Sequence, residues 1–386
     1  MRVCGVIAEY DPFHKGHAYH LKKARELSGA DFVVCVMSGS FTQRGLPALL
    51  PAHARAEMAL KCGADIVLQL PYAFSVREAE YFALGGVHIL HSLSCVTHLS
   101  FGCETDDLSL LIKAARILEE PTPDFEKALR SGLDQGLSHA QALGTAAADA
   151  LSLPPGFFHA PNTALALCYL RALIRLGSQI EPVPVRREYA YHASELESFP
   201  SATAVRGAIL RGDWNGIKNA IPENALPVLK SALAQGICPP HAADGILRSR
   251  LLMASAQDLS SLPGISEGLE MRILQGAEKT VSRAELIEFV KTRRYTQGRI
   301  SRALCHLMMD VKKSDLPGLP EYARILGFRK EAQPLLRQMQ KSGFPLISRP
   351  ARNDHYALDI RADEMRQIMA NHPRGETYRR SPVILP

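Results

Sequence analysis

Short apolar runs rich in β-branched residues alternate, over the first 190 residues, with longer segments whose apolar positions recur every three or four residues. The short runs predict buried strands, because a strand covered on both faces is apolar at almost every position. The longer segments predict helices with one apolar and one polar face. Together they predict an α/β fold with a Rossmann-like parallel sheet. The expected strands cover 3–8, 31–37, 65–70, 97–101 and 181–185, and the expected helices include 18–27, 55–61, 76–91 and 164–176.

The second half of the chain has a different pattern. Beyond about Gly212 the strand signals end, and helices rich in alanine, leucine and arginine are expected to run to about Gly343. The length of 386 residues also exceeds that of a typical single domain. The basic segment 374–380 suggests a flexible tail. We therefore expect a Rossmann-like α/β domain over 1–211, an all-α domain over 212–346 and a C-terminal extension over 347–386.

Composition places the chain among ordinary globular proteins, with 46% hydrophobic and 22% charged residues. Its eight cysteines are scattered, without a C-x-x-C pair or a Cys/His cluster at zinc spacing. No basic leader precedes a long apolar segment, and no run approaches eighteen apolar residues. We therefore expect a cytoplasmic protein with reduced thiols, no membrane partner and no metal site built from its own side chains.

The turn after the first strand holds two histidines, His14 and His17, just before the first expected helix. Backbone amides and the positive end of a helix dipole meet there, and Gly16 lets an anion approach the backbone closely. Two imidazoles three residues apart can donate hydrogen bonds to phosphoryl oxygens and stabilise charge that develops when a phosphate is attacked. The alternative is a pair of surface turn residues or a chance metal pair. The strand before and the helix after favour phosphate chemistry.

Later strand ends also carry small or polar residues, at the edge where open α/β sheets bind ligands. The loop 38–45 follows the second strand and supplies Arg44 and several hydrogen-bonding side chains. Gly102 ends the fourth strand, where a purine or ribose could lie against the backbone, although a plain turn glycine explains it equally. Asn162 stands in a Pro-Asn-Thr helix entry and is most simply an N-cap.

Two sets of arginine and hydroxyl side chains complete the candidate chemistry. Arg186 and Arg187 follow the last strand, where guanidinium groups can hold phosphate in a bidentate way, although paired arginines usually form only a solvated face. Ser201 and Thr203 stand at the start of a helix and can donate to phosphates, and Arg206 can neutralise a departing pyrophosphate. Ser201 is equally explained as a capping residue.

These motifs together resemble a known family. His14-Lys15-Gly16-His17 resembles the HxGH signature of the nucleotidyltransferase superfamily, and the segment 201–206 resembles its S-x-T-x-x-R element. The wider string GVIAEYDPFHKGH is similar to the bacterial tRNA(Met) cytidine acetate ligases, as are MSGSFTQRGLPA, PNTALALCYL and YARILGF. That family has Asn at the positions of Asp11 and Ser40. The resemblance spans nearly the whole chain and fades after about Leu346.

The resemblance implies an ATP-dependent ligase that activates acetate as acetyl-adenylate, with Mg²⁺ sharing the charge of the phosphates. It implies that catalysis is carried by His14, His17, Ser201, Thr203 and Arg206. It also implies that ATP is bound by the turn after the first strand and by the ends of the later strands. These contacts would be Ile7, Ala8, Glu9, Tyr10, Asp11, Pro12, Phe13, Lys15, Gly16, His20, Gly102, Asn162, Arg186 and Arg187.

The resemblance further names elongator tRNA(Met) as the acceptor, acetylated on the exocyclic amine of its wobble cytidine. The segment 291–341 holds twelve basic residues and four acidic ones, an excess larger than the net charge of +6 of the whole chain. A phosphate backbone needs such a patch, and a solvated helical face is the alternative. The candidate RNA contacts are Arg293, Arg294, Arg299, Arg302, Arg329 and Lys330.

Two other functions stay open. A metabolic adenylyltransferase that joins ATP to a small phosphorylated substrate would use the same HxGH chemistry and would not need a basic helical half. A non-catalytic RNA-binding protein could keep the fold as a scaffold, but the intact His14, His17 and Arg206 argue against it. The sequence predicts no oligomeric state.

Overall fold

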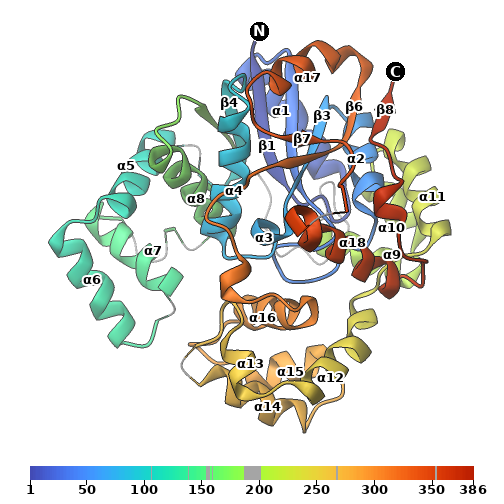
Figure 1. Ribbon diagram of the computed structural model, residues 1–386. Helices are drawn as coiled ribbons and strands as arrows, with labels where there is room; N and C mark the ends of the chain where they lie inside the picture. Colours follow the sequence, from blue (N-terminus) through green and yellow to red (C-terminus); the bar gives the residue numbers. More distant parts are fainter. Residues whose placement is uncertain are drawn as a thin grey trace.

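The computed structural model describes residues 1–105, 107–137, 139–153, 157–158, 160–186, 201–266, 268–352 and 354–386. Within these residues an eight-stranded sheet forms the centre, and helices surround it (Figure 1). Five strands run parallel in the order β5-β4-β1-β2-β3, which confirms the expected α/β class. Their bounds are Val3–Ala8 for β1, Phe32–Ser38 for β2, Ile66–Leu70 for β3, His98–Cys103 for β4 and Glu181–Arg186 for β5.

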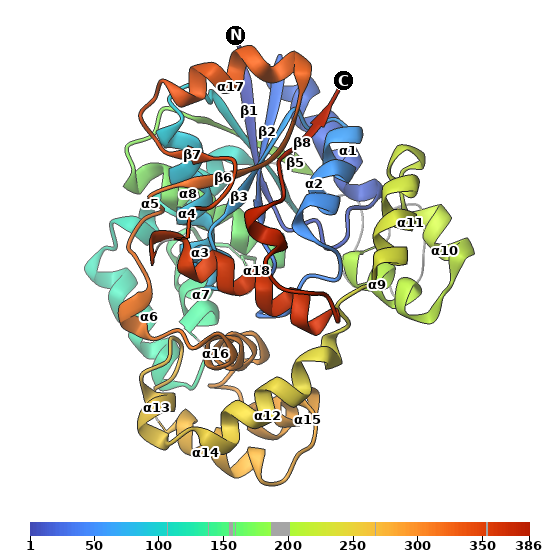
Figure 2. The ribbon, with the colours of Figure 1, turned by 45° about the vertical axis from the view of Figure 1, so that its right-hand side comes forward.

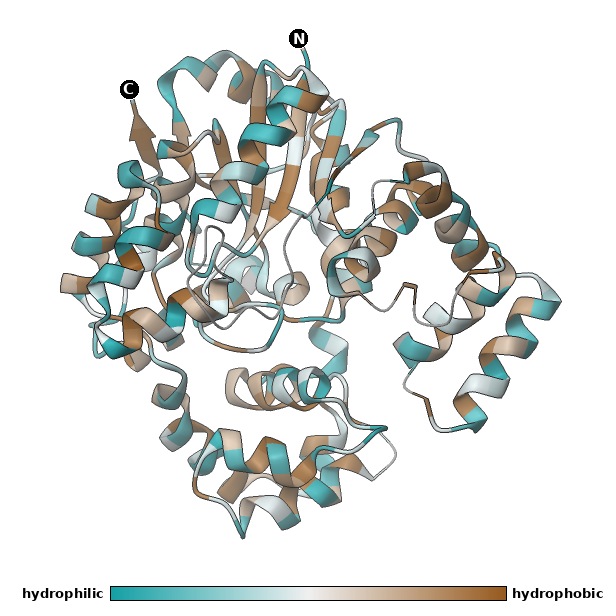
Figure 3. Cartoon of the chain, turned by 180° about the vertical axis from the view of Figure 1, so that it is seen from behind, coloured by the Kyte–Doolittle hydropathy of each residue, from teal (hydrophilic) through white to brown (hydrophobic). Residues whose placement is uncertain are grey.

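The central strands are buried on both faces. Val3 and Ile7 of β1 belong to one hydrophobic core, and Cys4 and Val6 belong to another on the opposite face. Successive side chains of a strand point to opposite faces, so a strand between two cores must be apolar at every position. Figure 3 shows the strands as mostly hydrophobic and the outer helices as mixed. Cys4 is fully buried and serves as a small apolar residue of this strand.

Two sets of helices cover the two faces. On one face α1 (Lys15–Ser28) and α2 (Ala52–Lys61) share a core with α9 (Ala202–Arg211), α10 (Trp214–Ala220) and α11 (Leu226–Gln235). On the other face α4 (Ala79–Ser92) packs with α8 (Pro161–Arg175) and α5 (Leu108–Glu119). With α6 (Pro123–Asp134) and α7 (His139–Ala150), α5 forms a lobe at the left of Figure 1, and short α3 (Tyr72–Ser75) follows β3.

The expectation that strands end after Gly212 is wrong. β6 (Ala323–Arg329) pairs antiparallel with β3, and β7 (Leu346–Ile347) and β8 (Val383–Leu385) pair with β6. The YARILGF block therefore belongs to the sheet of the first half, not to a helix. The first five residues of β6, Ala323 to Gly327, are all buried, which requires a place in a core that the first half of the chain supplies. The helix α17 (Gln333–Gln340) follows it.

A separate helical unit lies beyond the carboxyl ends of β1–β5, at the bottom of Figure 1. It comprises α12 (Asp244–Met253), α13 (Ala256–Ser260), α14 (Leu269–Ala277), α15 (Arg283–Val290) and α16 (Gln297–Met309). These helices enclose their own hydrophobic core, from Leu247 to Leu307. A second buried cluster joins α16 to Phe41 and Tyr72 of the sheet unit, so the two parts share a packed seam.

The expected C-terminal extension contains a packed helix. α18 (Ala357–Met369) lies between the sheet and α16, as Figure 2 shows. The expectation of a flexible tail at 374–380 is wrong, because Thr377 is buried and Arg374 forms an ion pair of 2.6 Å with Glu364. None of the described helices combines the length and the apolarity that crossing a bilayer requires.

Candidate active site

The topology places the candidate residues at one point of the sheet. The strand order reverses between β1 and β4, because the chain leaves β1 toward β2 and later returns to the other side of β1 as β4. Open α/β sheets bind ligands outside the carboxyl ends of strands at such a point. His14 ends the turn that leads from β1 to α1, and Gly102 lies near the carboxyl end of β4. The predicted turn therefore sits where a ligand is expected.

His14 and His17 form a reciprocal cap on the first turn of α1. The Nδ1 of His14 accepts a hydrogen bond from the amide of Gly16 at 3.1 Å, and the Nδ1 of His17 accepts one from the amide of His14 at 3.3 Å. The two rings stack, with centroids 3.7 Å apart. Because both Nδ1 atoms accept, the proton of each neutral imidazole is on Nε2. Each histidine can therefore donate from Nε2 to an anion.

Buried aromatic residues fix the backbone of this turn. Tyr10 has a φ of 49°, a left-handed conformation that non-glycine residues rarely adopt. Its side chain is 1% exposed, and its hydroxyl lies 3.5 Å from the sulfur of Cys35. The rings of Phe13 and His17 pack against it edge to face, each with centroids 4.9 Å away. This packing holds the turn in one conformation before any ligand binds.

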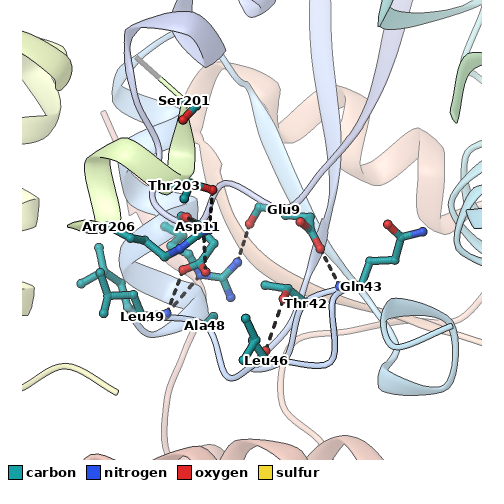
Figure 4. A network of polar contacts seen from close by, with 12 residues as sticks. Glu9, Asp11, Thr42, Gln43, Leu46, Ala48, Leu49, Ser201, Thr203 and Arg206 are labelled. Carbon is teal, nitrogen blue, oxygen red and sulfur yellow. Dashed lines mark hydrogen bonds and ion pairs between the residues drawn. The ribbon is translucent and has the colours of Figure 1, made fainter. Parts of the chain in front are cut away.

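The S-x-T-x-x-R element also contacts this turn, since Arg206 lies beside Asp11 (Figure 4). Ser201 caps α9 by accepting from the amide of Ala204, so its predicted capping role is confirmed. One nitrogen of Arg206 donates to the main-chain oxygen of Asp11 at 2.6 Å, and another donates to Thr203 at 3.0 Å. The Asp11 carboxylate lies 3.6 Å from Arg206 and accepts from the amide of Leu49 at 2.8 Å. Asp11 thus connects the histidine turn, α9 and the loop after β2.

A buried arginine, Arg55, is a site residue that the sequence reasoning missed. Its side chain is fully buried on α2 and donates to the main-chain oxygens of Glu9 at 2.6 Å, Leu50 at 3.2 Å and Gly39. Glu9 follows β1, Gly39 follows β2, and Leu50 lies in the loop between β2 and α2. Burial lowers the pKa of Arg55 to about 10, which leaves the guanidinium charged at neutral pH. No sequence pattern indicates such a role, because its partners are carbonyl groups.

The loop after β2 is also held from both sides. The amide of Gln43 donates to the Glu9 carboxylate at 2.6 Å, and burial raises the pKa of Glu9. Arg366 of α18 donates to the main-chain oxygens of Ala48 and Leu49, both at 2.8 Å. Figure 4 shows how the carboxylate of Glu9 meets the loop near Gln43. The loop therefore has a conformation set by the first strand and by a helix near the end of the chain.

Other contacts tie this loop to distant segments. Ser40 donates to Asp363 of α18 at 2.5 Å. On the helical unit, Arg283 donates to the main-chain oxygen of Gly45 at 3.0 Å, and Ser301 donates to that of Arg44. Gly45 has a φ of 68°, and a Cβ there would lie 2.6 Å from a main-chain oxygen of α16. The helical unit therefore contacts the candidate site through main-chain oxygens of this loop.

The ends of β4 and β5 complete the edge. Asn162 is not the N-cap of α8, because Ala160 occupies that position; Asn162 lies in the first turn and donates from Nδ2 to Glu104 at 2.6 Å. His20 of α1 lies 3.2 Å from the hydroxyl of Ser100 on β4. Arg186 is the last residue of β5. Arg187 lies outside the described residues.

The predicted RNA contacts do not form one surface. Arg293 and Arg294 are exposed on the helical unit, and Arg299 donates to the main-chain oxygen of Gly264 at 2.7 Å. Arg302 is mostly buried, with Glu78 at 3.9 Å. The amide of Arg329 donates to Asp65, just before β3 begins, so Arg329 and Lys330 lie at the opposite edge of the sheet. The basic excess counted along the sequence is therefore divided between two places.

Comparisons with known proteins show which family this chain belongs to. A family model described as HIGH Nucleotidyl Transferase matches residues 1–381. The tRNA(Met) cytidine acetate ligase of Fervidobacterium nodosum is 37% identical over 357 residues, which cover 90% of this chain and 84% of the relative. The ligase of the same name from Clostridium kluyveri is 34% identical and covers 100% of this chain and 99% of its own. The chain belongs to the tRNA(Met) cytidine acetate ligase family.

A solved structure extends this comparison to the fold. The crystal structure of Thermotoga maritima TmcAL bound with alpha-thio ATP has a TM-score of 0.90 and 30% sequence identity to this chain, and the match covers 100% of both. The predicted fold class and the family resemblance of the HxGH turn are both confirmed. Within the family's fold, the turn after β1 and the neighbouring segments bring together imidazole, guanidinium and amide donors, which together suit a polyphosphate.

Proposed function

We propose that this protein is an ATP-dependent ligase that forms acetyl-adenylate from acetate and transfers the acetyl group to N4 of the wobble cytidine of elongator tRNA(Met). The observation that carries the proposal is the reciprocal cap of His14 and His17, in a turn whose Asp11 is bound by Arg206, in a chain of this ligase family. Relatives of the same name cover almost the full length of the chain, which supports a complete reaction rather than a shared fold alone.

In the first step an oxygen of acetate attacks the α-phosphorus of ATP, and the bond to the leaving pyrophosphate breaks. Negative charge develops on the phosphoryl oxygens in the transition state. The Nε2 donors of His14 and His17 are oriented by the Nδ1 hydrogen bonds to the backbone, so they stabilise this charge without reorganising. No covalent intermediate with the protein is needed.

Arg206 and Thr203 supply donors for the departing phosphates. The Arg206 guanidinium donates to the main-chain oxygen of Asp11 and to Thr203. A phosphate is a stronger acceptor than a neutral carbonyl, because charge-assisted hydrogen bonds are about twice as strong. We therefore expect Arg206 to exchange the Asp11 carbonyl for a phosphate oxygen when ATP binds.

In the second step the exocyclic amine of cytidine attacks the acetyl carbon, the bond to AMP breaks, and the amine gives up one proton. The mixed anhydride is already reactive, so this step depends mainly on bringing the amine close. The helical unit lies beyond the carboxyl edge of the sheet and contacts the loop after β2. Its exposed Arg293 and Arg294 and the neighbouring Arg299 would hold the RNA backbone next to this edge.

Mg²⁺ is the expected partner of the ATP phosphates, and the protein side chains fit it poorly. The carboxylate of Asp11 is engaged by the amide of Leu49 and lies close to Arg206, and that of Glu9 is engaged by the amide of Gln43. No group of three or more His, Cys, Asp or Glu in the described part of the chain could hold a metal ion. We propose that Mg²⁺ is held by the phosphates themselves.

The deciding experiment incubates the purified protein with ATP, Mg²⁺, labelled acetate and deacylated bulk tRNA, followed by nucleoside analysis. We expect labelled N4-acetylcytidine with the wild-type protein and none with His17→Ala. The variant His241→Ala, which removes an exposed histidine outside the site, is the control and should retain full activity. ATP binding without any acetylated nucleoside would refute the acetate ligase and leave an adenylyltransferase or an RNA-binding scaffold.

A further inference from the structure

Glu104 forms a concentrated set of hydrogen bonds beside the ATP site. Its Oε1 accepts from Nδ2 of Asn162 at 2.6 Å and from the amide of the same residue at 3.3 Å. Its Oε2 accepts from the amide of Thr163 at 2.6 Å and from the hydroxyl of Thr163 at 2.8 Å. One carboxylate therefore satisfies four donors at the start of α8. The sequence reasoning assigned no role to Glu104.

These bonds connect chain segments that are expected to contact the nucleotide. Glu104 follows β4 directly and comes two residues after Gly102. It reaches across to Asn162, which is far away in the sequence. In the sheet register, Cys103 pairs with Arg186 at the end of β5, so that strand end is also aligned with Glu104. The carboxylate thus fixes the distance between the β4 edge and the first turn of α8.

Only a carboxylate satisfies this arrangement. All four partners are donors, and a glutamine would have one acceptor oxygen and an NH₂ group that faces donors. Partial burial by itself raises the pKa of Glu104, but the hydrogen bonds from Asn162 and Thr163 outweigh it and lower the pKa. The group is therefore ionised at neutral pH. Its negative charge also lies favourably at the N-terminus of α8.

The contact sets the orientation of the Asn162 amide. Because Nδ2 points to Glu104, the Oδ1 atom of Asn162 lies on the side away from it. An oxygen in that position accepts from a ligand donor, such as a ribose hydroxyl or the exocyclic amine of adenine. If the amide could rotate, it would present donor and acceptor equally and would lose this selectivity.

We propose that Glu104 is a positioning residue for ATP, which acts by holding Asn162 with its carbonyl oxygen toward the nucleoside. The inference rests on the proposed ATP site and adds a residue to it. Glu104 itself does not touch the nucleotide. Its substitution therefore weakens nucleotide binding, while the chemistry at His14 and His17 is preserved once ATP is bound.

The test is a double-mutant cycle on ATP affinity, measured by calorimetric titration and by KM in acetate-dependent ATP–pyrophosphate exchange. We expect Glu104→Gln and Asn162→Ala each to weaken ATP binding by roughly tenfold, and the double variant to be no weaker than either one. The kcat at saturating ATP should change less than threefold. Glu120→Gln, which replaces an exposed carboxylate at the end of α5, is the matched control.

Each outcome decides the proposal. Additive losses in the double variant, or unchanged ATP affinity in a folded Glu104→Gln protein, would overturn it. If Glu104→Gln does not fold, Thr163→Val removes one donor to the carboxylate and should weaken ATP binding about twofold with the same unchanged kcat. A wild type that binds ATP in this Glu104-dependent way but makes no acetylcytidine would refute the proposed function and leave this inference standing.

Discussion

The turn after β1 and the helical unit differ in where their charged and polar groups lie. At the turn, His14 is 2% exposed, and the guanidinium of Arg55 behind it is fully buried. In the helical unit, Arg293 and Arg294 are exposed side chains. Buried groups bind defined partners in a fixed geometry, whereas exposed charges act together and are screened by salt. Substitutions in the two regions should therefore differ in kind as well as in size.

The largest effect is expected at His14. The variant His14→Asn keeps a side-chain acceptor for the amide of Gly16, because asparagine is a good N-cap, but removes the Nε2 donor. We expect acetate-dependent ATP–pyrophosphate exchange to fall by about 10² to 10³-fold, as for the loss of one donor to a developing oxyanion. The melting temperature should stay close to that of the wild type. Activity within tenfold of the wild type would show that His14 is only a cap.

The next effect concerns the buried arginine behind the turn. Arg55→Leu leaves the main-chain oxygens of Glu9, Gly39 and Leu50 without their donor. We expect the free energy of unfolding to fall by about 2 to 4 kcal/mol, measured by urea denaturation. The exposed Arg211→Leu on α9 is the control and should change stability by less than about 0.5 kcal/mol. If the two variants lost the same free energy of unfolding, the hydrogen bonds of Arg55 to the three main-chain oxygens would not stabilise the fold.

A smaller effect, of a different kind, is expected in the helical unit. Replacing Arg293 and Arg294 by alanine should weaken tRNA binding about tenfold and reduce the slope of log K against log salt by about 2. The KM for ATP should not change. The pair Arg329 and Lys330, at the opposite edge of the sheet, is the matched control, and its replacement by alanine should leave the salt slope unchanged. If the two variants had the same slope of log K against log salt, Arg293 and Arg294 would not be the RNA contacts.

The smallest effect is a pH dependence in the seam between the two regions. Asp359 of α18 accepts from the amide of Tyr72 and from the hydroxyl of Tyr322, and burial raises its pKa to about 6. Because the folded pKa is raised, this group contributes stability that is fully present below its unfolded pKa and lost as the pH rises through 6. Asp359→Asn should therefore raise the free energy of unfolding by about 1 kcal/mol at pH 8.

The same variant should be nearly neutral at pH 4, where the carboxyl group of the wild type is protonated. Thermal unfolding at each pH gives the difference in the free energy of unfolding between wild type and variant. Other groups titrate equally in both proteins, so their contributions cancel in this difference. A variant that is less stable than the wild type at pH 8 would show that the ionised carboxylate is favourable in the seam.

The parts predicted from the sequence are those whose signals are local. The HxGH turn was predictable because β1, His14, His17 and α1 lie within one short segment. The strand β6 was not, because its burial depends on pairing with β3, far earlier in the chain, and its neighbours along the sequence are helical. The prediction of Asn162 as an N-cap rested on the neighbouring residues alone, because a Pro-Asn-Thr sequence is typical of a helix start. Its partner Glu104 follows β4 and is far away in the sequence.

The basic excess between 291 and 341 was the least reliable basis for predicting a surface that contacts RNA. A count along the chain adds residues that the fold separates, since Arg302 is mostly buried near Glu78 and Arg329 lies at the far edge of the sheet. Arg55 and Arg366 were missed for a related reason: each binds main-chain oxygens, which every sequence contains. Site residues of this class become visible only when the fold brings the carbonyl groups together.

The contacts of α18 also have a consequence for the synthesis of the protein. Arg366 holds the main-chain oxygens of Ala48 and Leu49, and Asp363 holds Ser40. The strand β6, which borders β3, is likewise made late. A ribosome that has produced the first 211 residues has therefore made every catalytic candidate but not the segments that hold the loop after β2. The loop after β2 acquires its contacts with α18 only at the end of synthesis, so we expect this loop to be less ordered in unfinished chains than in the folded protein.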